Sequence, residues 1–485
     1  MNPGAIVGIC IGGAFAALIL FMILRTVFNV AKPKKDIVTT EVKFDKKEFA
    51  ENLRGAVQIP TVTVIKEGQS YEPFLKYHEY LEKTFPNVFK YAEKTIINGY
   101  SLVLKIEGTD KDLLPGCFLS HQDVVPAPPE GWDTDPFGGE IKDGFLYGRG
   151  SLDMKWHMIA VLTALDDHLK TKGAPKRTIY CCFGHDEEIT GKDGAKNIAK
   201  YLYDNGIRME YVVDEGGSLI DGSLLGLNKM IAAIGVCEKG YADLVLTSVK
   251  DGGHASAPKK RSSVDAICQA VYDLSHLPMK TYICKPIKDM FRILAPHMKF
   301  LYRFIFTNAD ILAPVVKFAL ANLMPVTNSA VRTTFAFTQL QGADAPNVIP
   351  TTTKAVVNVR VNIGQTLDEV KRYIQKVVGK DITVEELNPG FDPTPVSDIT
   401  SDAYKKLEES ITDVFGDVVV SPYPFIAASD AKHYYNICNN VYRFGPIEMT
   451  TADQKLIHSD NERVNIEGAT KGAQFFSVFM EKTCY

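Results

Sequence analysis

Short apolar runs alternate with helical patterns along the chain after residue 45. Apolar runs predict strands, and segments that repeat apolar residues at helical spacing predict helices. The expected strands are 101–105, 117–120, 178–183 and 211–213, and the expected helices are 155–171 and 193–205. Because strands that alternate with helices form sheets covered on both faces, the pattern predicts an α/β fold with a mixed, mostly parallel sheet flanked by helices.

The pattern changes near residue 241. An alternating strand (242–249), a glycine-rich turn, several helices and a closing strand (354–361) predict a smaller α+β insertion. The expected domains are residues 45–240 together with 365–485, and the inserted residues 241–364.

Residues 289–324 of this insertion are unusually apolar and aromatic. One interpretation is helix packing inside the protein. The other is a surface that receives lipid chains or touches a membrane.

The amino-terminal segment 5–28 is apolar and carries one charge, Arg25. Its length is sufficient to cross a bilayer, so it predicts a transmembrane helix and a single-pass membrane protein. A cleaved signal peptide is the alternative. Arg25 and the following Lys32, Lys34 and Lys35 favour a cytosolic position for the large domain by the positive-inside rule.

Charge and cysteine content narrow the range of partners. The net charge is -4, from 54 basic and 58 acidic residues, so there is no electrostatic footprint for nucleic acid. Nine cysteines in 485 residues are too few for a disulfide scaffold. These features favour a small-molecule or short-peptide partner.

Three apolar runs end in residues of the types that commonly bind metals. One run ends at His121 and Asp123, the next at His185 to Glu188, and the third at Asp214 and Glu215. In a parallel sheet the carboxyl ends of strands line one crevice, so these residues would converge. Asp153 follows a glycine-rich loop at the start of a helix. Imidazole and carboxylate ligands suit zinc, and a shared carboxylate can bridge two ions.

Each residue taken alone also has an ordinary structural explanation. An Asp before a helix usually caps it, and paired Glu residues usually lie on a solvated surface. Several ligand types at equivalent strand ends favour a metal centre, because the ordinary explanation must be repeated for each of them.

The order of these motifs resembles a known family, the zinc exopeptidases and aminoacylases that include carboxypeptidase S and glutamate carboxypeptidase. The segment NSAVRTTFAFT (328–338) is most similar to the branch of carboxypeptidase S and the N-fatty-acyl-amino-acid synthase/hydrolases. The matching segments are SHQDVVP (120–126), DPFGGEIKDGFLYGRGSLDMK (135–155), HDEEITGKDGA (185–195), VVDEGG (212–217), GGHASAP (252–258), NVIP (347–350) and KLIHSDNERV (455–464).

The resemblance implies two Zn²⁺ ions per subunit, with Asp153 as the bridge between them. Its further ligands divide into two sets: His121 and Asp214 for one ion, Glu188 and His458 for the other. Asp123 would orient His121 by a hydrogen bond.

The resemblance also assigns roles in the reaction. Glu187 would be the general base, and His254 of the inserted lid and dimerisation domain would stabilise the oxyanion. In dimeric relatives this histidine reaches the site of the partner subunit, so a homodimer is compatible with the sequence. Asn347 and Arg360 are candidate substrate contacts, although Arg360 could equally form an ion pair on the strand surface.

These residues predict a membrane-anchored di-zinc amidohydrolase that cleaves, and can also form, the amide bond of N-acyl amino acids, including N-fatty-acyl amino acids. The alternatives are a carboxypeptidase that releases C-terminal amino acids from short peptides, and an inactive metal-binding membrane scaffold. Relatives in this branch favour a lumenal or extracellular catalytic domain, against the cytosolic side that the flanking charges favour.

Overall fold

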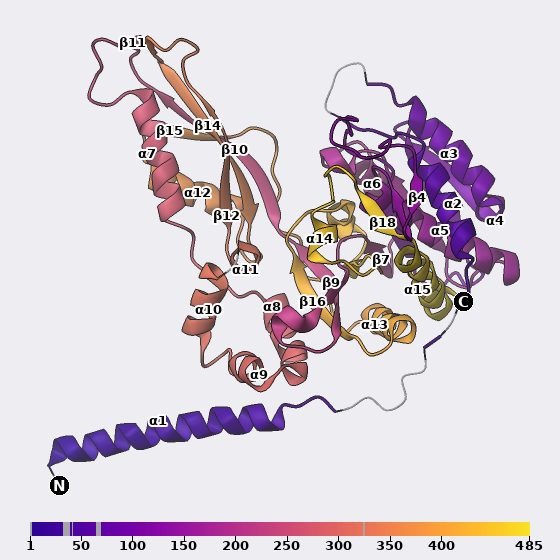
Figure 1. Ribbon diagram of the computed structural model, residues 1–485, viewed down its shortest axis with the longest axis horizontal. Coiled ribbons are helices and arrows are strands. Elements are labelled where there is room, and N and C mark those ends of the chain that lie inside the picture. The colour runs from indigo at the N-terminus through magenta and orange to yellow at the C-terminus, as the bar shows by residue number, and fades with distance from the viewer. Residues whose placement is uncertain (1, 33–38, 41, 65–68, 324) are drawn as a thin grey trace.

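The computed structural model describes residues 2–32, 39–40, 42–64, 69–323 and 325–485, so Lys34 and Lys35 lie outside the described residues. It consists of a large α/β body, an elongated smaller part and a long amino-terminal helix (Figure 1).

A nine-stranded sheet is the centre of the large body among the described residues. The order β1-β2-β6-β3-β7-β17-β9-β16 contains both parallel and antiparallel neighbours, and β8 pairs with β9. The strands are β1 Ala92–Ile97, β2 Ser101–Ile106, β3 Gly116–His121, β6 Ile179–Gly184, β7 Tyr211–Asp214, β8 Leu219–Asp221, β9 Met230–Glu238, β16 Val419–Phe425 and β17 Val441–Arg443. The expected mixed α/β fold is therefore confirmed.

Helices cover both faces of this main sheet. On one face lie α5 (Trp156–Thr171) and α15 (Ile466–Cys484), which pack against each other, and on the other lies α6 (Ala195–Asp204). The adjacent Cys181 and Cys182 of β6 are both buried, each in the core of a different face, because successive strand residues point to opposite sides. A fully buried central strand explains the continuous apolar run in the sequence.

The remaining elements of the large body surround this sheet. They are α2 Lys46–Val57, α3 Glu72–Thr84, α4 Pro86–Tyr91, α13 Asp402–Phe415 and α14 Thr451–Gln454, with the three-stranded sheet of β4 Glu140–Lys142, β5 Phe145–Tyr147 and β18 Arg463–Asn465.

The smaller part is an antiparallel sheet of order β12-β14-β10-β15. Its elements are β10 Gly240–Val249, β12 Thr334–Gln341, β14 Thr352–Val361 and β15 Ile382–Glu386, with helices α7 Ser263–His276 and α12 Leu367–Val378 packed on it. The short strands β11 (Gly253–His254) and β13 (Val348–Ile349) pair at its tip. Both α12 and β15 lie beyond residue 364, where the sequence pattern placed the end of the insertion.

Four further helices lie between α7 and β12 in the chain, and the first of them packs against β16 of the main sheet: α8 Lys285–Leu294, α9 Phe300–Thr307, α10 Ala313–Asn322 and α11 Pro325–Val331. Phe291 of α8 and Val316 of α10 are buried in the core of the large body. Phe300, Leu301 and Phe318 are exposed. The apolar segment 289–324 is therefore part core and part surface.

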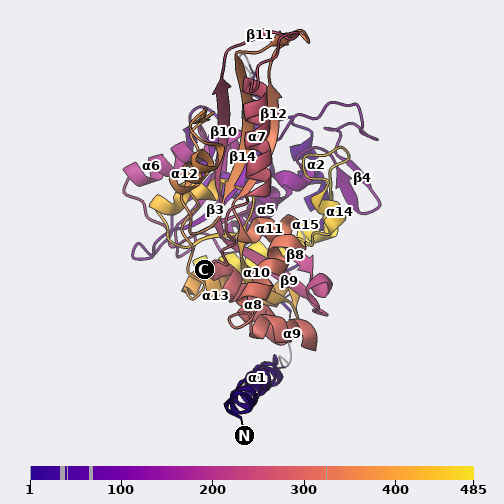
Figure 2. The ribbon, with the colours of Figure 1, turned by 90° about the vertical axis from the view of Figure 1, so that its left-hand side faces the viewer.

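The helix α1 (Pro3–Phe28) projects from the molecule beside α9 (Figures 1 and 2). Among the described residues it is the one helix that is long and apolar enough to cross a membrane, a property that signal sequences share. Its last turns contact the protein: Asn308 is buried and its Nδ2 donates to Thr26 Oγ1 at 3.1 Å.

Candidate metal centre

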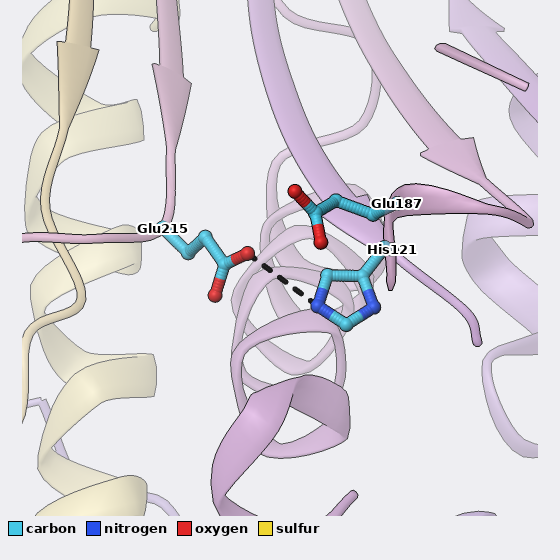
Figure 3. A group of neighbouring side chains, drawn as sticks. All are labelled: His121, Glu187 and Glu215. Carbon is cyan, nitrogen blue, oxygen red and sulfur yellow. Dashed lines mark ion pairs between the residues drawn. The ribbon is translucent and has the colours of Figure 1, made fainter. Parts of the chain in front are cut away.

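The carboxyl ends of β3, β6 and β7 bring the predicted ligands together. His121 is the last residue of β3, Glu187 and Glu188 follow β6, and Glu215 follows β7. Figure 3 shows the side chains of His121, Glu187 and Glu215 pointing toward one another from separate segments. One ligand atom from each of these three lies within 4.8 Å of the others.

Asp153 lies between two groups of side chains. Its Oδ1 is 3.0 Å from His121 Nε2, and its Oδ2 is 3.1 Å from His458 Nε2. His458 Nε2 is also 3.0 Å from Glu188 Oε2, whereas His121 Nε2 is 3.4 Å from Glu215 Oε1. The two carboxylate oxygens of Asp153 thus face two different ligand sets.

Asp123 supports the site in two ways. Its backbone carbonyl oxygen is 2.9 Å from His121 Nδ1, which leaves Nε2 directed at the cluster. Its carboxylate accepts hydrogen bonds of 3.1 Å from the backbone N–H groups of both Glu187 and Glu188. The carboxylate therefore fixes the backbone that carries the candidate base.

Asp214 and its neighbour Glu215 occupy different positions. The buried carboxylate of Asp214 accepts from the backbone N–H groups of Glu215 and Ala431, each at 2.9 Å. Glu215, which the sequence analysis did not assign as a ligand, is the one that contacts His121. The signal available in the sequence was the adjacent acidic pair at the end of β7, which cannot show which carboxylate turns inward.

A second residue that the sequence analysis missed is Glu462, four positions after His458. Glu462 is fully buried, and its Oε1 accepts from the backbone N–H groups of Leu152 at 2.8 Å and Asp153 at 3.0 Å. Its Oε2 is 2.6 Å from Arg149 Nη1. Glu462 therefore joins the loop that carries Asp153 to the segment that carries His458.

The electrostatics of the cluster favour a cation. Burial raises the pKa of Glu215 to about 8 and raises that of Glu187 well above its usual range. Burial also acts to raise the pKa of Asp153, but hydrogen bonds from His121 and His458 outweigh it and hold the pKa low. The bonds to Asp153 and Glu188 raise the pKa of His458 to about 10. Carboxylates this close together repel one another when they are ionised, and a divalent ion would relieve the repulsion.

The donor set fits a metal. Glu188 Oε1 is buried and has no hydrogen-bond partner among the described residues. Such an orphaned oxygen is costly unless a ligand satisfies it. Carboxylate oxygens with imidazole nitrogens are the mixture that zinc binds, and a hydrogen bond from a ligand histidine to a second group, such as that from His121 to the Asp123 carbonyl, is typical of such sites.

The structure does not bring the three predicted residues of the smaller part to this cluster. His254 is exposed in β11, where its Nδ1 is 2.8 Å from Ser256 Oγ, and both views place β11 at the tip away from the main sheet (Figures 1 and 2). Asn347 is exposed beside it, and its carbonyl accepts from the N–H of Ala255. The guanidinium of Arg360 stacks 4.8 Å over the ring of Tyr241.

Comparison with known proteins identifies the family. The family model described as Peptidase family M20/M25/M40 matches residues 117–482. The chain belongs to this family. It is therefore an amide-bond hydrolase, from a family of metal-dependent enzymes.

Curated relatives cover almost the whole chain. The N-fatty-acyl-amino acid synthase/hydrolase PM20D1 of Xenopus tropicalis is 36% identical over 95% of this chain and 91% of its own length. The probable carboxypeptidase S-like 2 of Dictyostelium discoideum is 33% identical over 99% of this chain and 94% of its own. The suspected family and branch are confirmed.

Solved structures support the fold of the M20/M25/M40 chain. The M20 family metallo-carboxypeptidase Sso-CP2 from Sulfolobus solfataricus matches with a TM-score of 0.64 and 18% identity, over 90% of this chain and 99% of that one. Human carnosine dipeptidase 1 matches with a TM-score of 0.61 and 16% identity, over 90% and 96% respectively. At such identities the likeness concerns the fold alone.

Proposed function

We propose that this chain binds two zinc ions and hydrolyses the amide bond of N-acyl amino acids, N-fatty-acyl amino acids included. The observation that carries the proposal is Asp153, whose two oxygens face His121 and His458 separately. A carboxylate in that position can be shared by two cations.

In this proposal each ion has three protein ligands. His121, Asp153 and Glu215 hold one ion, and Asp153, Glu188 and His458 hold the other. Glu215 takes the place first assigned to Asp214, which holds the backbone instead. Bound zinc supplies Lewis acidity and a water of lowered pKa. Three ligands per ion leave room for water and substrate.

Glu187 is the proposed proton carrier. Its carboxylate lies beside His121 and Glu215. It takes no part in the two contacts that Asp153 makes with His121 and His458. It accepts a proton from the attacking water and returns it to the leaving amine, an exchange worth roughly 10²–10⁴-fold in rate. Since no covalent acyl-enzyme is needed, the same groups can run the condensation of acid and amine.

A second copy of the chain supplies the oxyanion donor in this proposal. His254 lies at the tip of the smaller part, so a dimer in which the tip of one subunit covers the centre of the other would complete the site (Figure 1). Asn347 lies next to His254 and would arrive with it. Arg360 is a candidate for the substrate carboxylate, for which the planar guanidinium is suited.

The acyl specificity rests on the relatives and on the exposed apolar side chains of α9 and α10. A carboxypeptidase acting on short peptides is the second candidate, favoured by the carboxypeptidase S-like relative.

We also propose that α1 anchors the enzyme in a membrane with the catalytic body on the lumenal or extracellular side. Protease protection of sealed vesicles tests that orientation.

The decisive experiment is a hydrolysis screen of the purified full-length chain with zinc, using N-acyl glycines of increasing chain length beside dipeptides. We expect kcat/KM to rise with acyl length, and zinc removal or Glu187→Gln to abolish the reaction. A flat profile with faster dipeptide cleavage would favour the carboxypeptidase. Equal rates for Glu187→Gln and the unmodified chain would refute the assigned base.

A further inference from the structure

A cavity of about 760 Å³ lies where the end of α1 meets α8, α9 and α10. Its volume is in the range of small-molecule sites, which are roughly 300–1,000 Å³. Apolar side chains form most of its wall, chiefly those of Tyr282, Ile283, Phe291, Ala295, Phe306 and Ala313. None of these residues belongs to the metal centre.

Four cationic side chains also line this cavity: Arg25, Lys288, Arg292 and Lys317. Arg25 is neutralised by Asp310, which also lines the wall, at 3.1 Å. Lys288 and Lys317 form no salt bridge with any residue that the structure describes, and Arg292 has a single contact of 3.6 Å, with Asp289. The cavity therefore combines an apolar interior with an excess of positive charge.

The position of the cavity points to a lipid-like ligand. The last turns of α1 are held against α9 and residue 308, with Met22 and Thr26 buried, while Phe21, Leu24 and Phe28 of the same helix remain exposed. The exposed Phe300, Leu301 and Phe318 lie on the adjoining helices. A ligand in the cavity would thus adjoin the exposed apolar side chains of α1, α9 and α10.

We propose that this cavity binds an anionic acyl lipid, with the chain against Phe291 and Phe306 and the acidic head near Lys288, Arg292 and Lys317. Every methylene buried in the cavity adds to the affinity, so a long chain supplies most of it. The cations select a negative head. A free long-chain carboxylate and an anionic phospholipid share this chemistry. This proposal goes beyond the amide hydrolysis and does not depend on the zinc ions.

The test uses the full-length chain with two probes. Displacement of a fluorescent fatty acid by oleate, in a neutral detergent, measures the free carboxylate. Native mass spectrometry of protein released from phosphatidylserine/phosphatidylcholine nanodiscs measures the phospholipid. We expect the unmodified chain to bind at least one of the two.

Two variants locate the site. The triple variant Lys288→Gln, Arg292→Gln, Lys317→Gln should bind that probe at least about tenfold more weakly, since each cation near an anionic lipid adds to the affinity. Ala313→Trp should block the cavity without changing charge. The matched control is Lys76→Gln, Lys200→Gln, Lys406→Gln, which removes equal charge from α3, α6 and α13, none of which lines the cavity.

Oleate binding alone would identify the free carboxylate as the source, and phosphatidylserine binding alone the bilayer. The proposal is overturned if neither probe binds, or if the triple variant and Ala313→Trp both bind as the control does. Metal content and thermal unfolding, measured on each variant, separate loss of this site from loss of the fold.

Discussion

Replacing Glu462 by glutamine should destabilise the protein although the residue is not a metal ligand. The buried carboxylate pairs with Arg149 at 2.6 Å and accepts two backbone N–H groups, from Leu152 and Asp153. Glutamine retains one acceptor oxygen but presents an amide N–H₂ to the guanidinium. Breaking a buried ion pair from one side costs roughly 3–5 kcal/mol, because the remaining charge is uncompensated.

The same substitution should weaken metal binding. Glu462 fixes the backbone of Asp153, the proposed bridge, and removal of such an outer-sphere partner lowers metal affinity by about 10–100-fold. Urea unfolding of the metal-free chain and zinc titration with a competing chelator measure the two effects separately.

Glu467→Gln is the matched control, because Glu467 forms an exposed ion pair with Lys46 and such pairs are worth about 0–1 kcal/mol. The double variant Arg149→Met, Glu462→Gln should recover part of the lost stability, since neither partner then remains as an unpaired charge. Equal unfolding free energies for Glu462→Gln and Glu467→Gln would refute the reasoning.

Two further predictions concern the metal centre and a third concerns a buried histidine. Asp153→Ala should deplete both ions together in metal analysis, and retention of one full equivalent would exclude the shared carboxylate. Glu215→Gln should release one ion per chain whereas Asp214→Asn should retain both, and the reverse result would restore Asp214 as the ligand. His157 is buried near the start of α5, and burial lowers its pKa to about 3. The unfolded chain therefore takes up the proton first, and stability falls below pH 6.5 by about 1.4 kcal/mol per unit. Urea unfolding at pH 7 and 5.5 should show a smaller loss of stability for His157→Gln than for the unmodified chain, and equal losses would contradict the low pKa of His157.

The sequence pattern predicted the framework of the main sheet well. Strands β3, β6 and β7 are continuous apolar runs that end at or just before candidate site residues, and burial on both faces leaves that signature directly in the sequence. Helix α5 begins at Trp156, one residue after the expected start. The local pattern of apolar residues was sufficient for these elements because each of them is buried.

Side-chain direction at the strand ends could not be predicted in the same way. Asp214 and Glu215 are adjacent, and their roles depend on which backbone N–H groups approach from the segment near Ala431, more than 200 residues away. The role of Glu462 could not be predicted either, because it depends on contacts with Arg149 and with backbone groups of a distant loop. Long-range contacts of this kind leave no periodic signal.

The contacts between the end of α1 and the region of α9 affect how the catalytic body could be released by a protease. Asn308 donates a hydrogen bond to Thr26, and Asn29 donates one to Thr307. The N–H of Ala31 donates to the carbonyl of Pro296. With about 1 kcal/mol for each bond and about 2 for the buried Met22, the docked helix is held by roughly 5 kcal/mol. If α1 spans a membrane as proposed, a cut in the chain between residues 42 and 45 would leave only this weak non-covalent joint, which has to open before the catalytic body is released.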